Sequence, residues 1–218
     1  MLGFLHTGAV HVETFEGLVR AVEPAIVTRH AVREDLLAQA VAAGHVTTDV
    51  ARAVHAEILT LVEQGARVVV CTCSTLGSAV EATSTTGRAT VLRVDRPLAE
   101  QLLASGQPIL VVAALPSAMA TATELLQAVA REHGSQVQLR ELPCHDAWPA
   151  FLAGDRPGYL QKIAQQVEHA ALPGEHVMLA QASMAGAVPL IRRSNIQVFT
   201  SPELGVRAAI SAYRRSSS

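Results

Sequence analysis

The residues best suited to chemistry lie in the segment Val68–Gly77, which reads VVVCTCSTLG. Its first half is an uncharged, β-branched run that predicts a buried strand, and Cys73 falls just beyond it, before a helix that begins near Leu76. Ligands of open α/β sheets bind at this carboxyl edge. A helix N-terminus there offers unpaired N–H groups, which attract carboxylates and lower the pKa of a nearby thiol. Cys73 is therefore a candidate base or nucleophile in its thiolate form.

A structural role remains the alternative for several of these side chains. A small buried cysteine can fill the space between a strand and a helix, and we favour that role for Cys71, which lies inside the expected strand. Ser74 and Thr75 follow the thiol and add hydroxyl donors to the same turn. Ser117 opens an expected helix, so helix capping competes with ligand binding at that position.

A metal centre is the weaker alternative for the thiols. Cys71, Cys73, Cys144 and His145 lack the paired C-x₂-C spacing that is typical of metal-binding cysteines. Adjacent residues of an extended segment point in opposite directions, so Cys144, His145 and Asp146 cannot all face one centre. The sequence also contains neither of the glycine-rich loops that bind nucleotide phosphates. We therefore expect neither a metal nor another cofactor.

The composition argues against several classes of partner. The 218 residues carry a formal net charge of −2 with no basic run longer than two residues, and aromatic residues make up only 3%, which together disfavour nucleic acid. The longest apolar tract, Pro108–Ala122, is too short to span a membrane, and no signal peptide is evident. An odd number of cysteines, three, does not indicate a disulfide framework. We expect a cytoplasmic protein with a small-molecule partner, and the sequence leaves a homo-oligomer open.

Short apolar runs alternate with segments of helical period, which predicts an α/β fold with mostly parallel sheets. The expected strands are Leu2–Leu5, Ala25–Thr28, Arg67–Thr72, Thr90–Val94, Pro108–Ala113, Gln136–Leu142, His176–Ala180 and Ile196–Phe199. One expected helix starts near His11 and another at Ser201. Between them we expect helices at Thr47–Gly65, Pro97–Ala104, Ser117–His133, Arg156–Ala171 and Ala185–Ile191. Thr48 or Asp49 is the expected cap of the helix at Thr47–Gly65, and Asp95 that of the helix at Pro97–Ala104.

This pattern runs through two similar cycles. Each begins with an apolar strand and a polar loop, and each later contains a strand, a serine-bearing loop and a helix start rich in small residues, VVVCTCSTLGSAV in the first and VMLAQASMAGAV in the second. The repetition predicts two pseudosymmetric lobes, residues 1–96 with 200–218 and residues 97–199, each a mostly parallel sheet flanked by helices, with an active-site cleft between them.

The motifs GFLHTGAVHVETF, CTCSTLG, VLRVDRPLAEQLL, VVAALPSAMATATELL and VMLAQASMAGAVPLI carry a resemblance to a known family. The whole chain resembles the aspartate/glutamate/hydantoin racemase superfamily, which includes maleate isomerases and arylmalonate decarboxylases. The resemblance implies two α/β lobes, no cofactor, and a cysteine from each lobe on either side of the substrate's α-carbon.

Matched by motif, Cys73 takes the position of the first-lobe cysteine. The second-lobe motif reads Ala182-Ser183-Met184 here, which puts Ala182 at the second-base position and leaves no second thiol. The resemblance and the loop positions together suggest a set of substrate-binding residues, namely His6, Thr7, Ser74, Thr75, Ser117, Gln181, Ser183 and Met184.

Two functional hypotheses follow. The first is a cofactor-independent racemase, isomerase or decarboxylase that acts on a small carboxylate-bearing substrate through Cys73 alone. The second is a non-catalytic protein that binds small carboxylates and has lost the two-cysteine activity. An exposed Cys73 of low pKa would favour the enzyme, whereas a thiol packed under the sheet would favour the binding protein.

Overall fold

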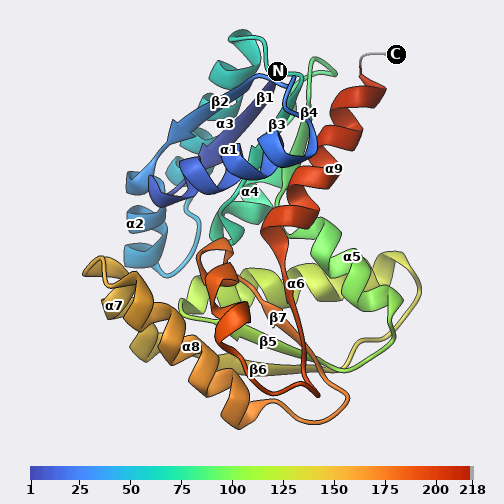
Figure 1. The fold of residues 1–218 in the computed structure, drawn as a ribbon. Helices are drawn as coiled ribbons and strands as arrows, with labels where there is room; N and C mark the ends of the chain where they lie inside the picture. The colour runs from blue at the N-terminus through green and yellow to red at the C-terminus, as the bar shows by residue number, and fades with distance from the viewer. Residues whose placement is uncertain (217–218) are drawn as a thin grey trace. The chain divides into compact units, whose positions relative to one another are not determined.

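The computed structural model describes residues 1–216 of the chain, which divide into two compact units (Figure 1). Unit 1 comprises Met1–Pro97 together with the C-terminal segment from Pro202, and unit 2 comprises Leu98–Ser201. Each unit contains one four-stranded sheet in which every neighbouring pair of strands is parallel. The predicted α/β class with two similar lobes is confirmed.

Both sheets have the same strand order. In unit 1 it is β2-β1-β3-β4, formed by β1 (Leu2–His6), β2 (Thr28–Val32), β3 (Val68–Cys71) and β4 (Thr90–Arg93). In unit 2 it is β6-β5-β7-β8, formed by β5 (Ile109–Ala113), β6 (Leu139–Pro143), β7 (His176–Leu179) and β8 (Gln197–Thr200). In each sheet the first strand of the unit lies beside the third, so the carboxyl ends of these two central strands are neighbours.

Helices follow the strands in both units. Those of the first unit are α1 (Val10–Val22), α2 (Glu34–Ala43), α3 (Thr48–Glu63), the short 3₁₀ turn η1 (Ser74–Leu76), α4 (Gly77–Glu81) and α9 (Ser201–Arg215). The helix α5 (Arg96–Ala104) begins at the end of unit 1 and continues into unit 2, which then contains α6 (Pro116–Glu132), η2 (His145–Ala147), α7 (Trp148–Leu152), α8 (Arg156–Ala170) and η3 (Ala182–Leu190).

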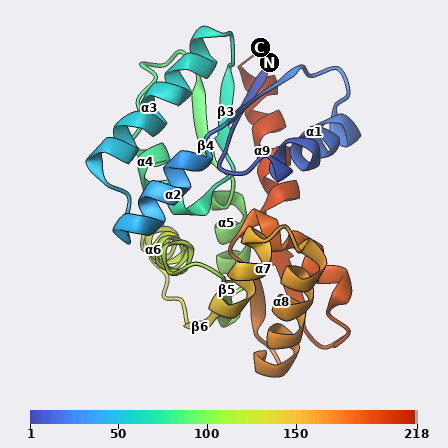
Figure 2. The ribbon, with the colours of Figure 1, turned by 90° about the vertical axis from the view of Figure 1, so that its left-hand side faces the viewer.

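The sheet of unit 1 is covered on both faces, as expected for parallel central strands that are apolar apart from His6 at the end of β1. Every residue of β1 and β3 is buried. Leu5, Val69 and Cys71 pack against the apolar stripe of α3 and against α2 and α4. Figure 2 shows α3 and α9 on opposite sides of these strands. The core thus holds the strand ends in fixed positions.

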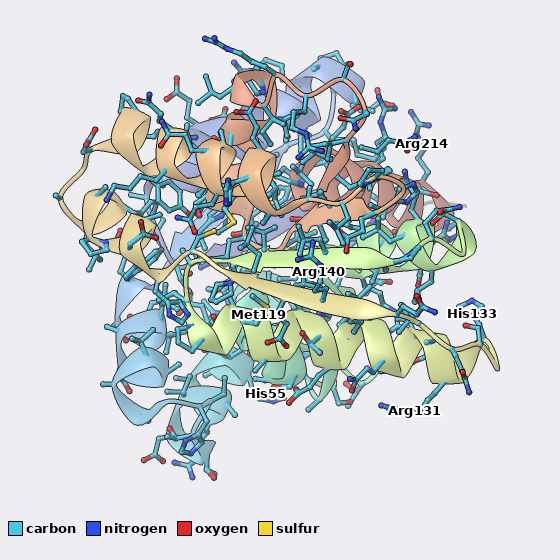
Figure 3. The ribbon with its side chains drawn as sticks, turned by 90° about the horizontal axis from the view of Figure 1, so that it is seen from below. His55, Met119, Arg131, His133, Arg140 and Arg214 are labelled. Carbon is cyan, nitrogen blue, oxygen red and sulfur yellow. The ribbon has the colours of Figure 1, made fainter. Side chains whose placement is uncertain are left out.

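The sheet of unit 2 is built in the same way. One face carries a cluster that includes Leu110, Val112 and Tyr159, contributed by β5 and α8. Figure 3 shows α6, marked by Met119 and His133, on the opposite side of the sheet, whose edge strand β6 is marked by Arg140. The Arg140 guanidinium pairs with the Glu175 carboxylate, at 2.7 Å between Nη2 and Oε2.

Some predicted boundaries were wrong. The second strand was predicted at Ala25–Thr28 but lies at Thr28–Val32, since Arg29 and His30 interrupt the apolar pattern of what is an edge strand. The helix α2 was missed. In place of a short helix at Ala185–Ile191, the 3₁₀ segment η3 starts three residues earlier, at Ala182.

Two predicted caps, on α3 and α6, were also wrong. Thr47 caps α3 by accepting a hydrogen bond from the backbone N–H of Val50. Asp95 directly precedes α5, as predicted for its cap, and its carboxylate pairs with the Arg93 guanidinium. The N-cap position of α6 is Leu115, so Ser117 lies inside the first turn of that helix.

Within residues 1–216, no helix combines the length and the apolar character that crossing a membrane requires.

Candidate active site

Cys73 lies at the carboxyl edge of the unit 1 sheet, two residues after β3 ends at Cys71. Its backbone is extended, with φ −103° and ψ 112°, and it occupies the N-cap position of η1. Ser74, Thr75 and Leu76 are buried within the turn, whereas Cys73 is only half-buried. Cys73 is therefore the thiol of this edge that solvent and ligands can reach.

Two opposing effects act on the ionisation of Cys73. Burial raises the pKa of its thiol above the ordinary value, and the negative charge of Asp95 adds to that rise. Thr7 and the backbone N–H groups of Thr75 and Leu76 act in the other direction: they favour the thiolate and lower the pKa, but by less than burial raises it. The expected depression of the pKa at the helix start is thus not found, and the resting group is a protonated thiol.

The other two cysteines are packed in the core. Cys71 and Cys144 are both fully buried, and burial raises the pKa of Cys71 strongly and that of Cys144 to about 12. Their S–H groups lie 3.8 and 3.9 Å from the backbone carbonyl oxygens of Cys73 and Leu142, respectively. Both act as small apolar residues, as we favoured for Cys71.

His6 ends β1 beside this edge and is part of a buried chain of hydrogen bonds. Its Nδ1 lies 2.8 Å from Thr72 Oγ1, its Nε2 lies 2.9 Å from His30 Nδ1, and the ring is fully buried. Burial lowers the pKa of His6 to about 3, so the ring is neutral. Both ring nitrogens therefore have partners within the protein, which makes His6 a support for the edge. Thr7, one residue later, is half-buried and reaches the Cys73 thiol.

The corresponding edge of unit 2 can be compared with that of unit 1 hydrogen bond by hydrogen bond. The N–H of Thr72 donates to the Leu5 carbonyl at 3.0 Å, and the N–H of Ala180 donates to the Val112 carbonyl at 2.9 Å. Cys73 precedes η1, and Gln181 precedes η3 with nearly the same backbone angles, φ −111° and ψ 135°.

One turn further, the two edges still match. The N–H of Leu76 donates to the carbonyl of Cys73, and the N–H of Met184 donates to the carbonyl of Gln181. The structural equivalent of Cys73 is therefore Gln181, and Ala182 corresponds to Ser74. The motif match placed Ala182 at the second-base position, and the hydrogen bonds between strands make its neighbour Gln181 the internal counterpart of Cys73. The position has no thiol in either assignment.

Gln181 and the side chains that follow it also make contacts within unit 2. Gln181 Oε1 accepts hydrogen bonds from the backbone N–H groups of Ala114 and Leu115, at 2.7 and 3.3 Å. Ser183 Oγ lies 2.9 Å from the Tyr159 hydroxyl, and both side chains are buried in the unit 2 core, as is Met184. Ser183 and Met184 thus face the core.

Ser117, half-buried in the first turn of α6, lies after the neighbouring strand β5. In the described part of the chain, no three His, Cys, Asp or Glu side chains are gathered as metal ligands.

Comparison with known proteins identifies the fold. No family model and no curated protein matches the sequence. Among solved structures, the glutamate racemase isoform RacE1 from Bacillus anthracis matches with a TM-score of 0.69 and 13% identity over 99% of this chain and 82% of its own. The aspartate racemase of Picrophilus torridus matches with a TM-score of 0.68 and 14% identity over 96% of this chain and 92% of its own. The chain has the racemase fold.

The same fold is found in an enzyme of another activity. An arylmalonate decarboxylase matches with a TM-score of 0.54 and 18% identity over 97% of this chain and 91% of its own. The racemase fold that we expected from the sequence motifs is thus confirmed at low sequence identity, and it accommodates both racemases and a decarboxylase.

Sequence reasoning missed several residues of the edge. His30 supports His6 from the neighbouring strand, Tyr159 holds Ser183, and Arg93 pairs with Asp95 behind the cysteine turn. An arginine inside an otherwise apolar strand, followed by an aspartate two positions later, was the available signal for the last pair.

Proposed function

We propose that this protein is a cofactor-independent enzyme that acts on a small carboxylate-bearing substrate through the Cys73 thiol. The observation that carries the proposal is the environment of that thiol, which is accessible at the carboxyl edge of a racemase-fold sheet and is contacted by Thr7 and two backbone N–H groups. Such donors stabilise negative charge where it develops, without a metal.

The protonated resting state of Cys73 favours one type of step. A thiol whose pKa is raised by burial is a better proton donor than proton acceptor at neutral pH. In the decarboxylation of a malonate-type substrate, the bond between the α-carbon and the leaving carboxylate breaks, carbon dioxide departs, and the electron pair remains as an enediolate with the second carboxylate. The Cys73 S–H proton then forms the new C–H bond, and water reprotonates the thiolate. This is the step to which a single thiol of raised pKa is best suited.

Unit 2 supports the same conclusion. The position equivalent to Cys73 holds Gln181, which does not titrate, and its carbonyl oxygen is already occupied by two backbone N–H groups. A chain with one proton-transferring thiol protonates the intermediate from one side, so we expect a single product enantiomer rather than a racemate.

A panel of amino acids, substituted malonates, maleate and hydantoins followed by NMR tests the proposal. We expect turnover of a substrate that carries at least one carboxylate, with formation of one enantiomer. Turnover confined to substrates without a carboxylate would contradict the proposal.

The second candidate, a non-catalytic carboxylate-binding protein, is favoured by the raised pKa of Cys73 and by Gln181 at the second position. Iodoacetamide labelling with and without small dicarboxylates separates the two. Labelling of Cys73 that rises with pH and is blocked by a dicarboxylate supports the enzyme. No labelling of Cys73 up to about pH 9, where an ordinary free thiol is largely ionised, would favour the binding protein.

A further inference from the structure

A buried ion pair lies behind the turn that carries Cys73. Arg93 is the last residue of β4 and pairs in register with Cys71 on β3. Its Nε donates to Asp95 Oδ1 at 2.7 Å and its Nη2 donates to Asp95 Oδ2 at 3.0 Å, so the guanidinium and carboxylate are joined in a bidentate arrangement. The side chains of Arg93 and Asp95 are 4% and 0% exposed.

The pair extends to the surface through a third group. Arg93 Nη1 donates to Glu81 Oε2 at 3.2 Å, and Glu81 Oε1 in turn accepts from Arg96 Nη1 at 3.1 Å. Glu81 is the last residue of α4, the helix that directly follows the cysteine turn. Arg93 therefore joins the end of β4 to the far end of α4.

The guanidinium also touches the start of α4. A Cβ atom placed on Gly77 would lie 2.3 Å from Arg93 Cζ, 2.4 Å from Nη2 and 2.7 Å from Nη1. The guanidinium therefore lies against the backbone of Gly77, and only glycine leaves room for it. The φ of Gly77 is −54°, an ordinary helical value, so the space for Arg93 rather than the backbone conformation requires this glycine.

Gly77 connects this contact to the thiol. Its N–H donates to the carbonyl of Ser74, which closes the η1 turn. The backbone N–H groups of Thr75 and Leu76 that favour the Cys73 thiolate belong to the same turn. A guanidinium pressed against Gly77 thus fixes the amides that contact the sulfur.

We propose that Arg93 and Asp95 are positioning residues for Cys73: their ion pair holds the amide-donating turn in place and its two charges, opposed to each other, set how readily the thiol ionises. The inference rests on the proposed role of Cys73, but it concerns the chemistry of the thiol and can be tested without a substrate.

Because Asp95 and Arg93 carry opposite charges, removing one or the other should shift the Cys73 pKa in opposite directions. The charged and titratable groups that act on this edge are Asp95, Arg93 and the neutral thiol of Cys71, with Glu81 and Arg96 further out. Removing the negative charge with Asp95→Asn lowers the Cys73 pKa. Removing the positive charge with Arg93→Met leaves the Asp95 charge uncompensated, which raises the Cys73 pKa. A merely structural role would shift the pKa in the same direction in both variants, because either change would loosen the turn.

The experiment measures the rate of Cys73 alkylation by iodoacetamide against pH, with the modified residue located by fragment masses. We expect Asp95→Asn to react at least about threefold faster than the parent at pH 7.5 and Arg93→Met at least about threefold slower, which corresponds to about half a pKa unit each way. Arg93→Lys keeps the charge without the flat guanidinium and should fall between the parent and Arg93→Met. Arg140→Met, which breaks an ion pair in unit 2, is the matched control and should leave the profile unchanged.

Gly77→Ala tests the contact itself. The added methyl collides with the guanidinium, so we expect slower alkylation of Cys73 in the parent background and little further effect in the Arg93→Met background, where the space is free. Should Arg93→Met fail to fold, the comparison of Asp95→Asn with Arg93→Lys remains decisive. Parallel shifts in Asp95→Asn and in the Arg93 variant tested, or no shift in either, would overturn the proposal whether or not the protein turns over a substrate.

Discussion

The sulfur of Cys73 differs from those of Cys71 and Cys144 in its access and in its neighbours. It is half-buried at a strand end and lies beside Thr7 and two backbone N–H groups, whereas the other two are enclosed by apolar side chains. These neighbours stabilise the thiolate form of Cys73, whereas burial favours the protonated thiol at rest. This environment supports the proposal that Cys73 acts as a proton donor.

The neutral His6 ring predicts a pH dependence of stability. In the folded chain its pKa is lowered to about 3 by burial, while in the unfolded chain it stays near the ordinary histidine value of 6.5. The unfolded state therefore binds a proton that the folded state does not, and stability contributed by the neutral ring is present above pH 6.5 and lost as pH falls towards 3. The free energy of unfolding should decrease by at most about 1.4 kcal/mol per pH unit from this group.

Urea denaturation of the parent and of His6→Gln at several pH values from 7 to 4 measures this effect. The parent should lose more stability than His6→Gln over that range, because the variant no longer carries a histidine that must stay neutral. The exposed His45→Gln serves as the matched control and should follow the parent. Equal losses in the parent and in His6→Gln would show that His6 does not drive the dependence.

The register of the two edges predicts which substitution adds a second proton-transferring group. Gln181→Cys places a thiol at the position equivalent to Cys73, and we expect it to reduce the stereochemical bias of the product. Ala182→Cys, one residue along, is the matched control and should keep the bias. Chiral chromatography of the products measures both.

The stability of Gln181→Cys and the product bias of Ala182→Cys also test whether Gln181 is the counterpart of Cys73. Loss of the Gln181 carbonyl leaves the N–H groups of Ala114 and Leu115 without that acceptor, so Gln181→Cys should also lower the free energy of unfolding by about 1–3 kcal/mol. A loss of stereochemical bias in Ala182→Cys but not in Gln181→Cys would restore the motif-based assignment.

Among the elements, α9 supports the end of β4, from which Arg93 and Asp95 reach the cysteine turn. A Cβ atom on Gly205 of this helix would lie 2.5 Å from Val94 Cγ2 and 2.8 Å from the Val94 carbonyl oxygen. The helix is thus packed directly on the backbone between Arg93 and Asp95.

Two helical glycines provide a matched pair for this contact. Gly205→Ala should lower the free energy of unfolding by about 1–3 kcal/mol, because its methyl meets backbone that cannot move aside easily. Gly17→Ala in α1 has no atom within 4 Å of the new methyl and should raise it by about 0.5–1 kcal/mol, since alanine costs less backbone entropy in a helix. Thermal unfolding of both variants measures the difference; a stabilised Gly205→Ala would contradict the close packing.

The elements that the sequence could predict are those whose burial leaves a clear pattern. The uncharged run that became β3 and the apolar stripe of α3 follow from strand and helix periods and were found close to their observed bounds. The edge strand β2 lacks such a run, because Thr28, His30 and Ala31 are half-buried and Arg29 and Val32 are exposed, so it was misplaced.

The candidate site was predictable only in part for a related reason. Cys73 stands out because a thiol follows a buried strand and precedes a helix start. The equivalence of Gln181, by contrast, depends on backbone hydrogen bonds between strands far apart in sequence, and the Arg93–Gly77 contact depends on packing between β4 and α4. Neither leaves a local pattern in the sequence.

At the scale of the whole molecule, two units repeat one strand order but not one set of reactive groups. Unit 1 has a thiol, a hydroxyl and a buried ion pair around the end of β3, and unit 2 has an amide and an occupied carbonyl at the end of β7. The two units thus share a strand order but differ in the groups at these strand ends, which is why we expect one-sided chemistry.

Turnover in D₂O by the parent, Cys73→Ala and Cys144→Ala tests the central claim most directly. We predict that the parent and Cys144→Ala incorporate deuterium at the α-carbon of one enantiomer and that Cys73→Ala incorporates none, because Cys144 is a packed core thiol and Cys73 transfers the proton. Undiminished turnover with stereospecific deuterium incorporation by Cys73→Ala would contradict the account.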